Sequence, residues 1–215
     1  MATPGELITA IANILGIPEV TVASYYRSLR EGGLVTKGGR GLSAPKMTTR
    51  DAVHLLLACG GARFERESAA SVVRDYIKLR AAHSARWRGE VEGWLENDEG
   101  VWILPMIQIP QLQALPPHHT FDDAFTALIE AFIAEEEAFK KLHLIEVVFS
   151  GPKPASRIRI DFVGTSELPP QEEETQYLLP ENSEPYNRPG DLSITRSVTG
   201  KTIHAIADLL RGASR

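Results

Sequence analysis

Residues 18–28 carry short, polar and hydroxyl-bearing side chains together with one guanidinium group. This set could read the edges of DNA bases and comprises Pro18, Glu19, Val20, Thr21, Ser24, Tyr25, Arg27 and Ser28. Small side chains let a helix approach the bases closely in the major groove, and hydroxyl and guanidinium groups donate hydrogen bonds to bases and phosphates. Two cations follow among glycines, Lys37 and Arg40, and cations neutralise phosphates. The ten residues together predict a contact with double-stranded DNA.

Two amphipathic helices must position this set. Apolar residues recur at spacings of three and four between residues 5 and 15, which predicts a first helix that ends at Gly16. Pro18 suits the start of a second helix over residues 19–31. In that second helix Val22, Tyr26 and Leu29 share one face, so we expect them to be buried and the polar set to face outward.

A basic hairpin is expected directly after the second helix. Gly32-Gly33 ends the helix, residues 34–36 predict a short strand, residues 37–41 a glycine-rich basic tip, and residues 42–47 a return strand. A third helix over residues 48–58 would close the small core. Residues 1–60 therefore predict a winged helix-turn-helix DNA-binding domain.

Residues 16–35 resemble the recognition-helix segment of winged-helix bacterial regulators of the MarR and GntR type. Gly16, the Thr21-Val22 pair, Leu29 and Gly33-Leu34-Val35 match in register, and residues 37–41 match the wing. The resemblance covers residues 10–41 only. It implies that the second helix lies in the major groove and that the wing contacts the backbone or the minor groove. The chain departs from the pattern in having Pro18 at the usual Ser or Thr cap and fewer cations than is typical.

Composition and charge limit the classes of protein that the chain could belong to. The 215 residues carry a net charge of −5 and one cysteine, Cys59, so an intramolecular disulfide is excluded. Residues 1–90 hold 13 Lys and Arg against 8 Asp and Glu, whereas residues 91–215 hold 10 against 20. This split favours a DNA-binding part joined to an acidic part that could contact another protein. No membrane-spanning run or signal peptide is predicted, and a cytoplasmic location is expected.

The remaining chain predicts an α+β fold. Residues 61–96 are expected to form a helical linker, with helices at 65–83 and 87–96. Residues 97–215 are expected to form an α+β body for dimerisation, effector binding or partner contact. The elements expected in it are a strand at 101–109, a helix at 120–142, a β-hairpin at 144–149 and 157–163, an irregular connection at 167–191, a strand at 192–198 and a helix at 199–211.

Other patterns give no support for catalysis. The pair His118-His119 lacks a second pair at metal-ligand spacing, and Gly200-Lys201-Thr202 lacks the earlier glycine of a phosphate-binding loop. The glutamate runs at 135–137 and 172–174 fit solvated surfaces. We therefore expect no enzyme activity, no metal and no cofactor.

Two functions remain open at this stage. The first is a sequence-specific double-stranded DNA-binding protein, a transcriptional regulator of bacterial or phage type acting as a homodimer. The second is a phage-type assembly or DNA-packaging protein in which the N-terminal helices mediate formation of a homo-oligomer. The sequence does not specify the operator, an effector, the oligomeric state or the role of the body.

Overall fold

A mixed α+β fold is present, as predicted. The computed structural model describes residues 2–38, 45–61, 68–88, 91–93, 109–134, 142–163, 171–180 and 193–212. Its helices are α1 (Pro4–Leu15), α2 (Glu19–Glu31), α3 (Thr49–Gly61), α4 (Ala69–Ile77), α5 (Pro110–Gln113), α6 (Phe121–Ile133) and α7 (Gly200–Gly212). Its strands are β1 (Arg80–Arg88), β2 (Val91–Gly93), β3 (Leu142–Gly151), β4 (Ala155–Phe162), β5 (Gln171–Leu178) and β6 (Ile194–Thr199).

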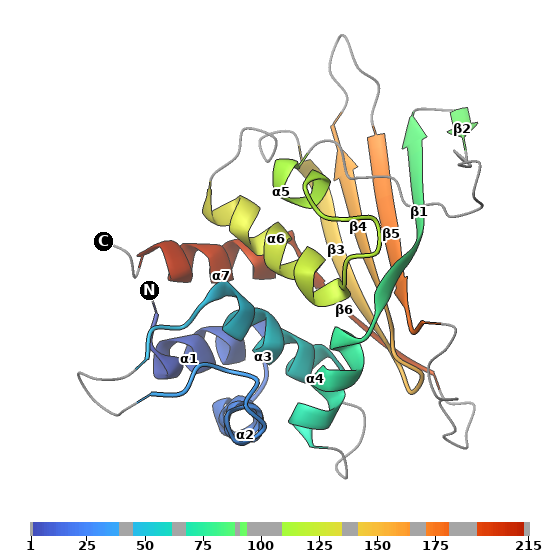
Figure 1. The fold of residues 1–215 in the computed structure, drawn as a ribbon. Helices are drawn as coiled ribbons and strands as arrows, with labels where there is room; N and C mark the ends of the chain where they lie inside the picture. The colour runs from blue at the N-terminus through green and yellow to red at the C-terminus, as the bar shows by residue number, and fades with distance from the viewer. Residues whose placement is uncertain are drawn as a thin grey trace.

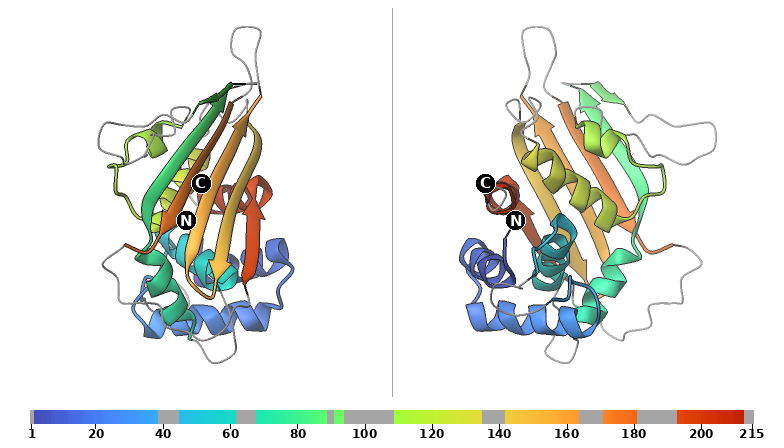
Figure 2. Two further views of the ribbon diagram at one scale, coloured as in Figure 1. Left: turned by 90° about the vertical axis from the view of Figure 1, so that its right-hand side faces the viewer. Right: turned by 60° about the vertical axis from the view of Figure 1, so that its left-hand side comes forward.

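The six described strands form one antiparallel sheet in the order β2-β1-β5-β4-β3-β6. Helices α3, α6 and α7 lie on one face of the sheet, and no described helix covers the other face (Figures 1 and 2). Helices α1 and α2 lie at one end of the molecule, beyond α3. The fold is therefore a layer of helices on a sheet, with α2 at its periphery.

Strand β4 shows how the sequence fits this arrangement, because its side chains alternate between buried and partly exposed. Ile158 and Ile160 face the helices, whereas Arg157 and Arg159 face the uncovered side. Arg159 lies 3.0 Å from Glu172 on β5, and Arg157 lies 3.6 Å from Glu146 on β3. The apolar face is covered by helices and the uncovered face carries ion pairs, as expected for an antiparallel sheet with one face toward solvent.

Aromatic residues from four parts of the chain meet between the helices and the sheet. The ring of Phe121 on α6 lies 5.2 Å from that of Tyr177 on β5 and 6.0 Å from that of Phe149 on β3. Tyr76 on α4 joins them and donates a hydrogen bond to the Ser150 carbonyl at 2.8 Å. The buried hydrophobic residues form one cluster that extends from Ala2 to Leu210, so the N-terminal helices and the sheet share a core.

Several predicted elements are confirmed. Helix α2 has the predicted bounds, and α1, α3 and α7 differ from the predicted helices by only a few residues. The hairpin of β3 and β4 and the last strand, β6, are also present. The start of the helix predicted at 120–142 is confirmed by α6, which a Thr120–Asp123 capping box begins, but α6 ends at Ile133 and Leu142 already belongs to β3. The strand predicted at 101–109 lies outside the described residues up to position 108.

The prediction of two wing strands is wrong for the residues that the structure describes. Residues 34–38 and 45–48 form no strand, and residues 39–44 lie outside the description. The backbone is fixed by other contacts instead. The Thr36 N–H donates to the Asp51 carboxylate at 2.7 Å, and the Met47 N–H donates to the Ala2 carbonyl at 2.8 Å. The first hydrogen bond holds residues 34–38 against α3, and the second holds residues 45–48 against the N-terminus.

Two further predictions are corrected by the sheet. The segment 61–96 is not a helical linker, because only α4 is helical in its described part and residues 80–88 form β1, which pairs with β5. The segment 167–191 was expected to be irregular, but residues 171–178 form β5 in the middle of the sheet. Residues 97–215 therefore contribute four described strands, β3 to β6, to the sheet. The described helices in this range are α5, α6 and α7.

The described helices were also compared with the requirements of a membrane span. None of the helices in the described ranges is long and apolar enough to cross a bilayer.

Gly61 permits the close packing of α3 on α4, and its replacement should destabilise the protein. A Cβ atom at this position would lie 2.4 Å from Tyr76 Cε2 and 2.8 Å from Val72 Cγ1. Tyr76 is 1% exposed and held by its hydrogen bond, so it cannot move away easily. We expect Gly61→Ala to lower the free energy of unfolding in urea by about 1 to 2 kcal/mol. Gly5→Ala, where nothing lies within 4 Å, is the control and should cause no loss.

Candidate nucleic-acid interface

The connection between α1 and α2 is a three-residue turn with a defined geometry. Gly16 has φ of 66°, a left-handed conformation that glycine adopts without strain. The Ile17 N–H donates to the Ala12 carbonyl at 3.0 Å and closes the end of α1. Ala12 is 5% exposed, and α1 packs against α2. A short turn of fixed geometry therefore joins the two helices.

One face of α2 is buried and fixes the rotation of the helix about its axis. Val22 and Leu29 are fully buried and Tyr26 is 7% exposed, as the spacing predicts. The Tyr26 hydroxyl also contacts Met47 Sδ at 3.9 Å. Any rotation that buried the outer face of α2 would expose these three side chains, so the outward direction is set by the core.

The outer face carries three of the predicted contact residues as a stripe, the exposed Val20, Ser24 and Arg27 at positions i, i+4 and i+7 of α2, and the exposed Glu31 follows on the same face at i+11. Successive members of such a stripe lie about one turn apart, so they form a continuous surface. We call this surface the α2 stripe. It offers an apolar group, a hydroxyl group and a guanidinium group in order along the helix.

The other predicted residues of this helix have different environments. Pro18 and Glu19 are exposed at the start of α2, and the Glu19 carboxylate accepts a hydrogen bond from Thr9 on α1 at 3.0 Å. Ser28 does not face outward, because its Oγ accepts a hydrogen bond from the Ala70 N–H on α4 at 3.2 Å. Thr21 and Tyr25 are half-buried, and Tyr25 packs against the core. The structure thus groups three of the eight predicted helical residues into one exposed stripe.

The predicted wing cations are described only in part. Lys37 is exposed, whereas Arg40 lies outside the described residues. Beside Lys37, Gly38 lies so close to Pro45 that a Cβ on it would be 2.8 Å from Pro45 Cδ. The Asp51 carboxylate accepts hydrogen bonds from the N–H and hydroxyl groups of both Thr36 and Thr48 at 2.7 to 2.9 Å. These contacts place Lys37 on a backbone that is anchored to the start of α3.

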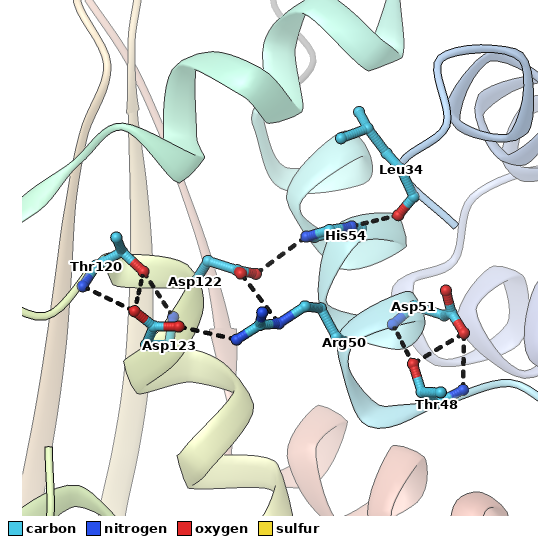
Figure 3. A network of polar contacts seen from close by, with 8 residues as sticks. All are labelled: Leu34, Thr48, Arg50, Asp51, His54, Thr120, Asp122 and Asp123. Atoms are coloured by element: carbon cyan, nitrogen blue, oxygen red, sulfur yellow. Dashed lines mark hydrogen bonds and ion pairs between the residues drawn. The ribbon is translucent and has the colours of Figure 1, made fainter. Parts of the chain in front are cut away.

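A buried ion-pair network connects the end of α2 to α6 (Figure 3). His54 on α3 lies between the Leu34 carbonyl, 2.5 Å from Nδ1, and Asp122 Oδ1, 3.2 Å from Nε2. Arg50, one turn earlier on α3, lies 3.3 Å from Asp122 and 2.8 Å from Asp123. The side chains of His54 and Asp122 are 9% and 6% exposed. We call these residues, His54, Asp122 and Arg50, the α3–α6 network.

The geometry of His54 favours its charged form. Nδ1 faces the Leu34 carbonyl oxygen and Nε2 forms an ion pair with the Asp122 carboxylate, and this arrangement favours the doubly protonated ring. Burial opposes the charge, but the interactions with Asp122 and with the Leu34 carbonyl together outweigh it and raise the pKa of His54. Because Leu34 follows α2 closely, the two contacts of His54 connect the chain just after α2 to α6.

The sequence gives no local signal for this network. In the sequence His54 stands alone among apolar residues, and Asp122 reads only as part of a helix cap. They meet because α3 and α6 pack side by side on the sheet, although 68 positions separate them. The position of His54 within a buried helix was the one available clue, since a buried histidine requires partners for its ring nitrogens.

His119 and Cys59 have structural environments. His119 Nδ1 lies 2.8 Å from the Pro116 carbonyl, and its Nε2 lies 3.0 Å from the Tyr177 hydroxyl. Burial lowers the pKa of His119 and raises the pKa of the Cys59 thiol to about 12. Within the described ranges no group of three potential metal ligands is present. Gly200 and Lys201 form the first turn of α7.

The chain was also compared with known proteins. No protein-family model matches it, and neither the curated proteins nor the solved structures gave a match. The residues and their geometry are therefore the basis for any function assigned to the chain.

Proposed function

We propose that the protein binds double-stranded DNA sequence-specifically through α2, as a transcriptional regulator of bacterial or phage type. The observation that carries this proposal is the α2 stripe on a helix whose opposite face is fully used by the core. A short turn with a left-handed glycine joins α2 to α1, which is the arrangement that presents a recognition helix to the major groove.

The position of α2 fits this role. It lies at the end of the molecule away from the sheet, beyond α3 (Figure 2). A helix of 13 residues is about 20 Å long and, with side chains, about 10 to 12 Å wide, which matches the width of the major groove. Lys37, exposed just beyond α2, would lie near the phosphates that border the groove.

A homodimer completes the proposal. One helix contacts only a few base pairs, and two-fold symmetry doubles the contact and the specificity. The acidic residues 91–215, with 20 Asp and Glu against 10 Lys and Arg, would be repelled by DNA and are assigned to contacts between subunits or with another protein. A cytoplasmic location follows from the proposed role.

A titration of the full chain against duplex DNA tests the proposal. The duplexes would be one of random sequence and one from the DNA flanking its own gene, each at two salt concentrations. We expect a preference for one sequence that persists at the higher salt concentration. The absence of any duplex binding at low salt would reject the proposal.

Lys37, the exposed cation after α2, and Arg40, three residues later in the sequence, are the basis of a separate prediction. Lys37→Ala combined with Arg40→Ala should weaken binding to every duplex by a similar factor, because phosphate contacts carry no sequence information. The slope of log K against log salt concentration should become less steep by about two contacts. A slope equal to that of the parent protein would show that these two residues do not contact phosphates.

The alternative, an assembly or DNA-packaging protein that oligomerises through its N-terminal helices, has less support from the structure. The apolar faces of α1 and α2 are buried within the same chain, with Leu7, Ile11 and Val22 all fully buried. These faces are therefore not available for a second subunit. Sedimentation of the free protein as a ring larger than a dimer would restore this alternative.

A further inference from the structure

Val20 is an apolar side chain whose exposure the fold does not explain. Its side chain is 77% exposed, compared with 52% for Val163 and 38% for Leu178, the other large hydrophobic residues exposed in the described ranges. It is the second residue of α2, in the first turn of the helix. The buried face formed by Val22 and Leu29 prevents α2 from turning Val20 inward.

Helix formation gives no reason for valine at this position. A β-branched side chain loses rotamer freedom in a helix, so an exposed valine is less favourable there than alanine, lysine or glutamate. The neighbours of Val20 on the stripe, Ser24 and Arg27, are polar and also exposed. Val20 is thus a single apolar contact point next to hydrogen-bonding groups, rather than part of an apolar patch for protein docking.

We infer that Val20 contacts the 5-methyl group of a thymine in the major groove, an inference that rests on the proposed function. The thymine methyl is the apolar group that a base pair presents in this groove, and small apolar side chains on recognition helices recognise it. The first turn of the helix is where recognition helices approach base edges most closely. Val20 therefore acts as a specificity-determining residue and not only as a spacer.

The other members of the stripe extend this inference to a short sequence element. Arg27 lies seven residues after Val20, or about 10 Å along the helix axis. An arginine donates two hydrogen bonds to guanine O6 and N7. At about 3.4 Å per base pair, the thymine and the guanine would lie within about three base pairs of each other in each half-site. Ser24, between them, can donate to or accept from either neighbouring base.

A methyl-deletion experiment tests the inference. Duplexes that bind the full-length parent protein would first be selected from a random pool. Each thymine of the selected site would then be replaced in turn by deoxyuridine, which removes only the 5-methyl group. Binding would be measured for the parent protein, for Val20→Ala and for Val163→Ala, a control at an exposed valine away from α2.

We expect one thymine in each half-site at which deoxyuridine weakens binding of the parent about three- to fivefold, the factor for one buried methyl group. In Val20→Ala the deoxyuridine effect should be smaller than in the parent, because the side chain is shorter, and Val163→Ala should behave like the parent. Selective binding without any deoxyuridine effect, or an effect in Val20→Ala as large as in the parent, would overturn the inference and leave the proposed function intact. Failure to select any duplex would reject the proposed function itself.

Discussion

Arg27→Ala is expected to weaken binding to the selected duplex by about 1 to 3 kcal/mol, or roughly 5- to 150-fold in the dissociation constant. Arg27 is exposed on the α2 stripe, two turns from the start of the helix, and its guanidinium group can reach the edge of a guanine. The loss should be larger on the selected duplex than on a random one, because a base contact contributes only when the correct base is present.

Arg30→Ala is the matched control for this prediction. Arg30 is exposed on the same helix and carries the same charge, but it lies outside the stripe. Its removal should affect the selected and the random duplexes by a similar small factor. Both variants should unfold within about 0.5 kcal/mol of the parent protein, since both changes are on the surface. Equal losses for Arg27→Ala and Arg30→Ala would show that Arg27 supplies charge only and does not read a base.

The local elements were predictable because each is encoded within a few neighbouring residues. The spacing of Val22, Tyr26 and Leu29 gives the buried face of α2, and Gly16 gives the turn before it. The alternation of Arg157, Arg159 and Asp161 with apolar residues gives β4. In each case the periodicity of the side chains matches that of the element.

Strand β5 could not be predicted in the same way, because its neighbours determine its structure. Its sequence, Gln-Glu-Glu-Glu-Thr-Gln-Tyr-Leu, has few strand-forming residues and resembles a solvated loop. It becomes a strand because β1 and β4 pair with it on both sides, and two of its glutamates, Glu172 and Glu174, lie next to Arg159 and Arg157. Tertiary contacts thus override local preference at this position.

The sequence could not show that some of the predicted contact residues of α2 are covered, for a related reason. A helical wheel places Thr21, Tyr25 and Ser28 next to the exposed residues, but it cannot show that α4 packs on that side. The hydrogen bond from the Ala70 N–H to Ser28 arises only once α2 and α4 are adjacent. Packing of α4 on α2 therefore covers part of the helical surface that was predicted to contact DNA. The α2 stripe of Val20, Ser24 and Arg27 remains exposed.

Asp122→Ala should be the most destabilising of the substitutions considered, with a loss of about 3 kcal/mol in the free energy of unfolding near pH 6. The Asp122 carboxylate is buried and pairs with both His54 and Arg50. Its removal leaves the His54 ring with no anionic partner in a buried site. The loss stays at the lower end of the range for buried pairs because the Arg50 side chain is 53% exposed and can turn toward water.

The size of this loss should depend on pH in a defined direction. The folded-state pKa of His54 is raised above its ordinary value of 6.5, so its contribution to stability is fully present below pH 6.5. That contribution disappears as the pH rises through the raised pKa. Parent and Asp122→Ala should therefore differ most near pH 6 and progressively less toward pH 9. His119, whose pKa is lowered, acts in the opposite direction but is present in both proteins and cancels.

Urea unfolding of both proteins between pH 6 and pH 9 measures this effect, with Asp123→Ala as the control. Asp123 is the next residue on α6 and also contacts Arg50, but it has no contact with His54 and mainly caps the helix through Thr120. Its loss should be about 1 kcal/mol and should not change across this range. A constant difference between the parent protein and Asp122→Ala would mean that His54 is neutral in the folded state. The anchor between Leu34 and α6 would then be a neutral hydrogen bond, and the position of α2 would not depend on pH.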